Sequence, residues 1–260
     1  MKIHLLSDLH FEFQRGPSWK PNPLDADVVI LAGDISSHTY GLDWAAWAFK
    51  EWPSQPKLLY VAGNHEYYGA HLGMLSEFQK PSWESAGVTF LEKRAVEING
   101  VRFLGCTLWS DFSLYGLDRQ AAYMEAAQRG IADYDVIYGR ERKTITPHDT
   151  LELHKKAVSW LDRELARPFN GKTVVITHFA PHPRCVATEY EGSELSPYFV
   201  TDLSWLMTKH RIDVWCYGHT HTNTDFIAQN GCRVISNQKG YPRELIAGNQ
   251  AFDATLTVEI

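Results

Sequence analysis

The chain has 260 residues, of which 44% are apolar and 22% charged, a composition typical of a globular protein. Its formal net charge of -6 argues against an extended nucleic-acid-binding surface and against an anionic-membrane surface. The longest aliphatic run, residues 28–32, is too short for a transmembrane helix, and the N-terminal run is too short for a signal peptide. Four cysteines without a C-x-x-C pair predict free thiols and a cytoplasmic, reducing location.

Short apolar runs rich in β-branched residues predict buried strands early in the chain. They are residues 3–6, 28–31 and 58–61. Helices are expected after the second and third runs, over residues 42–52 and 70–79, and each is closed by a following proline. This alternation of strand and helix is typical of an α/β fold.

Antiparallel strands are expected next, over residues 88–91, 95–98 and 101–104. Asn99-Gly100 separates the last two, and this pair is the strongest short signal for a hairpin. Residues 110–145 show the least regular pattern and form a candidate substrate-specificity cap. The basic residues Arg140, Arg142 and Lys143 lie in this region, where a solvated charge run is the default interpretation.

Thr146-Pro147 predicts the start of a long helix to about residue 166. After it we expect a strand over residues 173–177, a helix over 202–209 and a strand over 212–217. Three strand-like runs follow, over residues 225–228, 233–236 and 255–258. No linker or repeat interrupts the chain. We therefore expect one domain over residues 1–260, with two packed sheets and helices outside them.

Five polar clusters follow the expected strands and carry most of the chemical information. They are Asp8-Leu9-His10, Gly33-Asp34, Gly63-Asn64-His65-Glu66, Thr177-His178 and Gly218-His219-Thr220-His221. Each alone is an ordinary cap, turn or loop sequence. Five strand ends rich in oxygen and imidazole ligands instead predict one shared metal centre.

Two divalent ions about 3.5–4 Å apart can clamp the attacking and leaving oxygens of a phosphoryl transfer. An anionic bridge must hold them together, and Asp34 is the candidate. One ion would then take the ligands Asp8, His10 and His221, and the other would take Asn64, His178 and His219. Imidazole and carboxylate ligands suit Mn, Fe or Zn, so a divalent or mixed-valence pair is expected, without a choice among these metals.

The charge balance favours a phosphate ligand, because two divalent ions outweigh the carboxylates of Asp8 and Asp34. The positive surplus would attract a phosphoester and lower the pKa of a bridging water. The resulting hydroxide is the predicted nucleophile.

The blocks D-x-H, G-D, G-N-H-E, H and G-H-x-H, in this order, resemble the calcineurin-like metallophosphoesterases. The resemblance runs from Asp8 to His221 and implies an α/β fold, a four-layer α/β/β/α sandwich of two mixed β-sheets flanked by helices. It also implies the same ligand division, with Asp34 as the bridge. His65 would be no ligand but the catalytic residue that stabilises the transition state or protonates the leaving oxygen.

Three departures from known branches narrow the expectation. The phosphate-binding arginine that protein Ser/Thr phosphatases of this superfamily carry after the bridging Asp is missing from residues 35–38. Ser37 occupies the position of the tyrosine ligand of purple acid phosphatases. The lipid A pathway diphosphatases carry Arg where this chain has His65. A protein phosphatase is therefore less expected, and so is the tyrosinate-to-iron colour of purple acid phosphatases. The substrate of the lipid A pathway diphosphatases is not transferred to this chain.

The substrate-binding residues stay unknown from the sequence, because specificity is expected in loops around residues 110–145 and 182–200. We expect a small phosphoester, with a nucleotide as one option, and no membrane partner; the oligomeric state is open. One alternative is a non-catalytic scaffold with the same fold. Within the enzyme class, the alternative is a nuclease or cyclic-nucleotide phosphodiesterase. Some residues could either line the substrate pocket or have a purely structural place in the core or a loop. They are Tyr67, Tyr68, His182 and residues 237–241.

Overall fold

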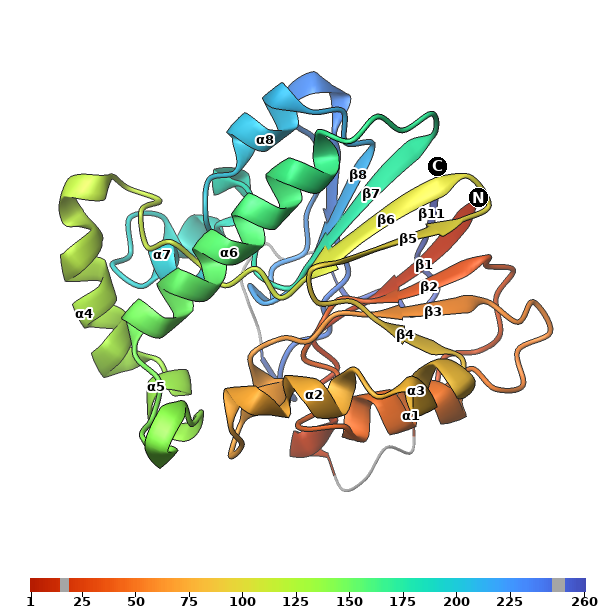
Figure 1. Ribbon diagram of the computed structural model, residues 1–260, viewed down its shortest axis with the longest axis horizontal. Helices are drawn as coiled ribbons and strands as arrows, with labels where there is room; N and C mark the ends of the chain where they lie inside the picture. The colour runs from red at the N-terminus through yellow and green to blue at the C-terminus, as the bar shows by residue number, and fades with distance from the viewer. Residues whose placement is uncertain (15–18, 245–250) are drawn as a thin grey trace.

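The strands of the computed structural model form two sheets (Figure 1), and the structure describes residues 1–14, 19–244 and 251–260. The first sheet has the order β11-β1-β2-β3-β4. Its strands are β1 Lys2–Leu6, β2 Val28–Leu31, β3 Lys57–Tyr60, β4 Val88–Phe90 and β11 Thr257–Glu259. All neighbours pair in parallel except β11, which runs antiparallel to β1.

The second sheet has the order β5-β6-β7-β8-β10-β9 and is also mixed. Its strands are β5 Arg94–Ile98, β6 Val101–Cys106, β7 Lys172–Thr177, β8 Val214–Tyr217, β9 Asp225–Ile227 and β10 Arg233–Ser236. The four inner strands are parallel, and the edge strands β5 and β9 are antiparallel to their neighbours. Asn99 and Gly100 have φ of 49° and 76°, the positive values of the predicted hairpin turn between β5 and β6.

Alternating side chains divide the core into layers, because successive residues of a strand point to opposite faces. Ile3 and Leu5 of β1 belong to a buried cluster that includes residues of both sheets, and so lie between them. Leu6 of β1 and Leu31 of β2 belong to the other cluster, together with Trp44 of helix α1 (Tyr40–Ala48). The chain therefore fills both faces of its sheets with apolar side chains.

Helices cover the outer faces of both sheets, as Figure 1 shows. Helices α1, α2 and α3 lie along the first sheet, and α6 and α8 lie along the second. Their bounds, with those of the remaining helices, are α2 Leu75–Phe78, α3 Pro81–Ser85, α4 Gln120–Gly130, α5 Asp133–Val136, α6 Pro147–Leu165, α7 Ser196–Phe199 and α8 Ser204–Lys209. Two mixed sheets flanked by helices confirm the expected fold class.

Helix α6 agrees with its prediction, and the Thr146 N–H donates to the Asp149 carboxylate at 2.8 Å at its start. The expected helix over 70–79 is shorter, because His71 accepts a hydrogen bond from the Gly73 N–H and a 3-10 turn, Leu72–Met74, precedes α2. None of the helices in the described residues has both the length and the apolar character needed to cross a bilayer.

Residues 110–145 are more regular than expected, and this is a correction. They contain the eleven-residue helix α4 and the short helix α5. The alanine-rich stretch of α4 favours helix, and its Tyr123, Met124, Ala126 and Ala127 form a buried face. The pattern was obscured because aromatic and basic residues surround it.

Candidate metal centre

The predicted ligands converge because their strands are parallel neighbours whose C-terminal ends share one edge of each sheet. Asp8, Asp34 and Asn64 follow β1, β2 and β3 of the first sheet, and His178 and His219 follow β7 and β8 of the second. All the residues predicted for the site are buried: Asp8, His10, Asp34, Asn64, His65, His178, His219 and His221.

Two compact groups of donor atoms meet at Asp34, and a third group links His65 to them. Within each group, the potential ligand atoms all lie within 4.8 Å of one another. The first two are Asp8, His10 and His221, and Asp34, His178 and His219; the third is His10, Asp34 and His65. Oδ2 of Asp34 also lies 3.9 Å from His10 Nε2 and 3.3 Å from His178 Nε2, so this carboxylate faces both groups. The arrangement agrees with a bridging role for Asp34.

We call Asp8, His10 and His221 the first half of the site. His221 Nε2 lies 3.3 Å from Asp8 Oδ1 and 2.9 Å from His10 Nε2. Asp8 also accepts a hydrogen bond from the His219 N–H at 2.9 Å, which ties the G-H-x-H loop to the end of β1. These contacts bring donors from the two sheets together.

Glutamates hold the outer nitrogens of this half. Glu12 Oε1 lies 2.9 Å from His10 Nδ1, and Glu244 Oε2 lies 2.5 Å from His221 Nδ1. Burial opposes protonation of His221, but hydrogen bonds to Asp8 and Glu244 raise its pKa to about 10. A carboxylate at Nδ1 keeps the proton there and directs Nε2 toward a metal ion.

We call Asn64, His178 and His219 the second half of the site. His178 Nδ1 donates to the Ala32 carbonyl at 2.8 Å, and Nε2 lies 3.1 Å from Asn64 Oδ1. Burial opposes protonation of His178, but the charge of Asp34 raises its pKa to about 9. Burial also opposes ionisation of Asp34, yet the histidines around it, His178 first, hold its pKa well below its usual value.

His219 provides the test of whether the donors fit a metal ion. Its buried Nε2 has no hydrogen-bond partner within the part of the chain that the structure describes. The ring lies against Phe179, with centroids 3.9 Å apart, and burial holds its pKa well below 6.5. A neutral imidazole with an unsatisfied nitrogen is costly unless a ligand completes it. This nitrogen and the carboxylates around it fit a divalent cation.

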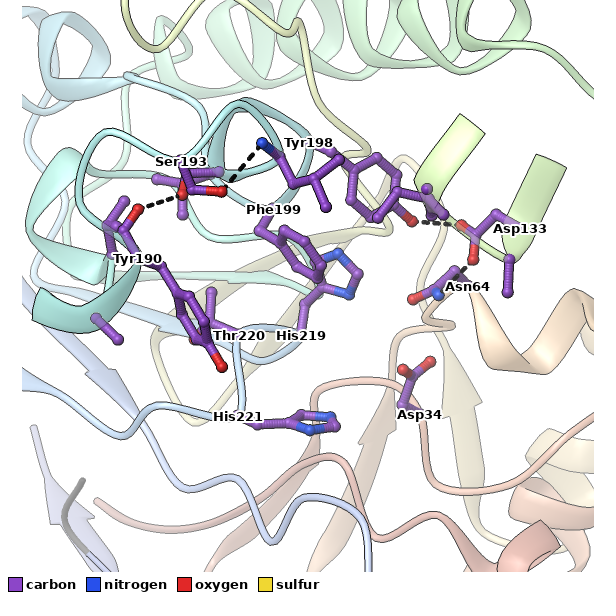
Figure 2. Close-up of a pocket in the computed structure, with 18 of the residues that line it drawn as sticks. Asp34, Asn64, Asp133, Tyr190, Ser193, Tyr198, Phe199, His219, Thr220 and His221 are labelled. Carbon is purple, nitrogen blue, oxygen red and sulfur yellow. Dashed lines mark hydrogen bonds between the residues drawn. The ribbon is translucent and has the colours of Figure 1, made fainter. Parts of the chain in front are cut away.

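Asp133 of α5 orients the amide of Asn64 (Figure 2). Its Oδ1 accepts from Asn64 Nδ2 at 2.9 Å and from the Tyr68 hydroxyl at 2.8 Å, and its Oδ2 accepts from the Tyr198 hydroxyl. Because the amide nitrogen is held by Asp133, Asn64 Oδ1 faces His178 and the second half. Residues 110–145 thus contact the site through the buried carboxylate of Asp133.

His65 lies beside His10 and Asp34, and its Nε2 is 3.9 Å from Asp34 Oδ2. Its Nδ1 is 2.8 Å from Glu12 Oε1, its Nε2 is 3.0 Å from the Tyr241 hydroxyl, and its ring stacks on Tyr68. Burial opposes protonation of His65, but the charges of Asp34 and Glu12 raise its pKa. This is the direction of shift that the proton donor predicted at His65 would need.

Glu66 fixes the loops that carry the ligands. Its buried carboxylate accepts from the backbone N–H groups of Asp34 at 3.0 Å and Gly63 at 2.7 Å, and from the Tyr60 hydroxyl at 2.7 Å. Burial and the charge of Asp34 raise its pKa to about 7. The last residue of the G-N-H-E block is therefore a structural clamp and no ligand.

The backbone is strained where the ligands sit. Positive φ values occur at five of the seven predicted ligands: Asp8 (53°), His10 (49°), Asp34 (52°), His219 (75°) and His221 (50°). Each such residue costs of the order of 1–3 kcal/mol. Close packing adds a constraint at Gly63, where a Cβ would lie 2.1 Å from Asp34 Oδ1. The conformation of these loops lowers local stability, and it directs the ligand side chains toward one point.

A cavity of about 400 Å³ opens beside the site. Asp34, Asn64, His65, His219 and His221 line it, and so do residues 130–133 and the segment from Cys185 to Val200. Tyr68 and Tyr241 line it as well, whereas Tyr67 packs in the core against Phe78 and Trp109. His182 is not among the lining residues and contacts Gln229.

The sequence did not identify several residues that support the site: Glu12, Asp133, Tyr198 and Glu244. Glu12 carried a weak signal, since it lies two residues after His10, but the others lie in segments without a recognisable motif. Arg142 and Lys143 are exposed and lie outside the cavity lining, as the solvated interpretation expects.

Comparison with known proteins identifies the family of the chain and proteins of similar fold. An uncharacterized protein of Acanthamoeba polyphaga mimivirus, L509, is 26% identical over 268 residues, which cover 93% of this chain and 92% of the viral protein. The crystal structure of a phosphopantetheinyl hydrolase from Mycobacterium tuberculosis has a similar fold, with a TM-score of 0.68, 19% identity and coverage of 93% and 90% of the two chains. A dimetal phosphatase from Danio rerio is similar with a TM-score of 0.53, 14% identity and coverage of 92% and 87%. The calcineurin-like phosphoesterase family model matches residues 1–223, and the chain belongs to this family.

Proposed function

We propose that the chain is a metal-dependent phosphoester hydrolase with a dinuclear centre. One observation carries the proposal: two groups of buried ligand atoms meet at Asp34, and one of them includes His219 Nε2, which has no hydrogen-bond partner among the described residues. When bound, two ions of Mn, Fe or Zn would supply a hydroxide nucleophile near neutral pH and positive charge for the phosphate.

The residues of the chain have distinct roles in this proposal. Asp34 would hold the two ions together, the first half would bind one ion, and the second half would bind the other. His65, whose pKa is raised by Asp34 and Glu12, would donate a hydrogen bond or a proton to the leaving oxygen. Glu12 contacts both His10 and His65, so one carboxylate positions a ligand and the proton donor together.

The substrate class is a small phosphoester, either a monoester or a diester. Two alternatives differ from this proposal: a non-catalytic scaffold, and a nuclease or cyclic-nucleotide phosphodiesterase. A non-catalytic scaffold would not need an intact ligand set and a polarised His65. A nuclease or cyclic-nucleotide phosphodiesterase would act on nucleotide diesters, and a small nucleotide fits the cavity better than a long chain does.

Hydrolysis of p-nitrophenyl phosphate and bis-p-nitrophenyl phosphate with added Mn²⁺, Fe²⁺ or Zn²⁺ tests the proposal. We expect turnover that chelation abolishes and metal restores. The substrate panel should include nucleotides, cyclic nucleotides, sugar phosphates, phosphopeptides and a phosphopantetheinyl ester, the last because of the name of the similar M. tuberculosis enzyme. A metal-loaded protein inactive on the whole panel would favour the scaffold.

Residues 1–260 are proposed to act as one domain, in which residues 110–145 form a cap over the site. Four buried free cysteines, Cys106, Cys185, Cys216 and Cys232, agree with a reducing compartment such as the cytoplasm.

A further inference from the structure

One side of the cavity beside the metal centre is lined by residues other than the predicted ligands. We call Ile131, Val186, Tyr190, Leu195 and Phe199 the wall of the cavity. Ile131 follows α4, Val186 and Leu195 belong to the segment from Cys185 to Val200, and all three line the cavity and are only half-buried. Tyr190 is 48% exposed and lines it with Phe199. Figure 2 shows Tyr190 and Ser193 across the cavity from Asn64 and Asp133. Apolar side chains left open to a pocket are typical of a ligand-binding wall.

The wall contains no cation for a second anionic group. Among the described residues that line the cavity there is no Lys and no Arg. The carboxylates present are already engaged. Asp133 accepts hydrogen bonds from Asn64, Tyr68 and Tyr198, and Glu244 contacts His221 and the Tyr241 N–H. The wall therefore offers no charged partner to an anionic or a cationic substrate group.

We infer that the wall binds the organic arm of the phosphoester, and that this arm is uncharged and largely apolar. The inference rests on the proposed function, because the phosphate itself is assigned to the metal ions. Burying an unpaired charge against Ile131, Val186 and Leu195 would be costly, whereas burying apolar surface there is favourable. Substrates with a second phosphate or carboxylate on the arm are disfavoured, and this excludes sugar bisphosphates and nucleoside diphosphates.

Calorimetric binding of non-hydrolysable phosphonates to the Mn²⁺-loaded protein tests the inference. The series is methylphosphonate, hexylphosphonate and 5-carboxypentylphosphonate, which hold the phosphonate constant and change only the arm. Each methylene that is fully buried should tighten binding about fourfold, so hexylphosphonate should bind at least about tenfold tighter than methylphosphonate. Its binding should also show the more negative heat-capacity change. The terminal carboxylate should remove most of the gain.

The variant Ile131→Lys places a cation on the wall and should reverse the preference, so that the carboxylate arm binds tighter than the hexyl arm. Leu117→Lys is the matched control, because Leu117 is 75% exposed and lies outside the cavity lining. Because both affinities are measured on the same protein, their ratio does not depend on the fraction of the protein that is active. A circular-dichroism melt verifies that each variant is folded, and Val186→Lys replaces Ile131→Lys if the latter is not.

Equal affinity for the methyl and hexyl arms, or tighter binding of the carboxylate arm to the unmodified protein, would overturn the inference. Binding does not depend on turnover, so the two proposals separate. Hydrolysis without discrimination among the arms contradicts only the wall, and discrimination without hydrolysis contradicts only the phosphoesterase.

Discussion

The two halves of the metal site hold their histidines by different chemistry. In the first half, Glu12 and Glu244 contact the outer nitrogens of His10 and His221. In the second half, a backbone carbonyl holds His178, aromatic rings surround His219, and Asp133 contacts the amide of Asn64 but neither histidine of this half. The first half therefore has anionic support, and the second has neutral support.

This difference predicts that the two ions are bound unequally. Carboxylate partners increase the basicity of a ligating imidazole, whereas a carbonyl and aromatic packing chiefly fix its orientation. We expect the first half to hold its ion more tightly and the second half to be more sensitive to geometry. The following variants test that comparison, in order of decreasing expected effect.

Asp34→Ala removes the carboxylate that both halves face. Activity should fall to the level of the chelated protein, and metal titration should show the loss of at least one ion. Elemental analysis of the purified variant measures this directly. Asp43→Ala, an exposed residue on α1, is the control. Full metal-dependent activity in Asp34→Ala would show that the halves do not share this residue.

His65→Ala should lower kcat by about 10²–10⁴-fold, the usual contribution of general acid catalysis, and leave both ions bound. Combined metal analysis and steady-state kinetics separate these effects, with His148→Ala as a control on an exposed histidine. If the variant lost its metal, His65 would have to be counted as a ligand of one half.

Glu12→Gln should lower activity about 10–100-fold, the range typical of outer partners of metal ligands. Because Glu12 contacts His10 and His65, both metal affinity in the first half and kcat should decline. The second ion should be retained. Glu97→Gln, exposed on β5, is the matched control. An equal weakening of both ions would contradict the distinction between the halves.

Asp133→Asn should have a smaller effect, about tenfold, confined to the second half. The substitution keeps the size of the side chain but adds a donor where Asn64, Tyr68 and Tyr198 all donate. Asp135→Asn on the same helix is exposed and serves as the control. Calorimetric metal titration measures the affinity of each ion, and weaker binding of the first ion alone would contradict the assignment.

The fold and the clustering of the candidate ligands could be predicted from the sequence for a physical reason. Buried parallel strands need short apolar runs, and residues at their C-terminal ends are brought together whatever the intervening chain does. Asp8, Asp34 and His178 could therefore be assigned to one centre before their distances were known. Glu244 and Asp133 could not, because their contacts depend on how distant loops pack against the site.

Helix α4 illustrates the same limit in secondary structure. Its alanine-rich stretch is a helix signal, but the surrounding aromatic and basic residues made residues 110–145 look irregular. The apolar wall was equally hidden, because Ile131, Val186 and Leu195 share no motif and meet only in the tertiary structure.

Anomalous diffraction from crystals of the Mn²⁺-loaded protein tests the dinuclear centre most directly. We expect two manganese peaks about 3.5–4 Å apart, with Asp34 between them, the first half on one ion and the second half on the other. A single peak, or two peaks that do not share Asp34, would contradict it.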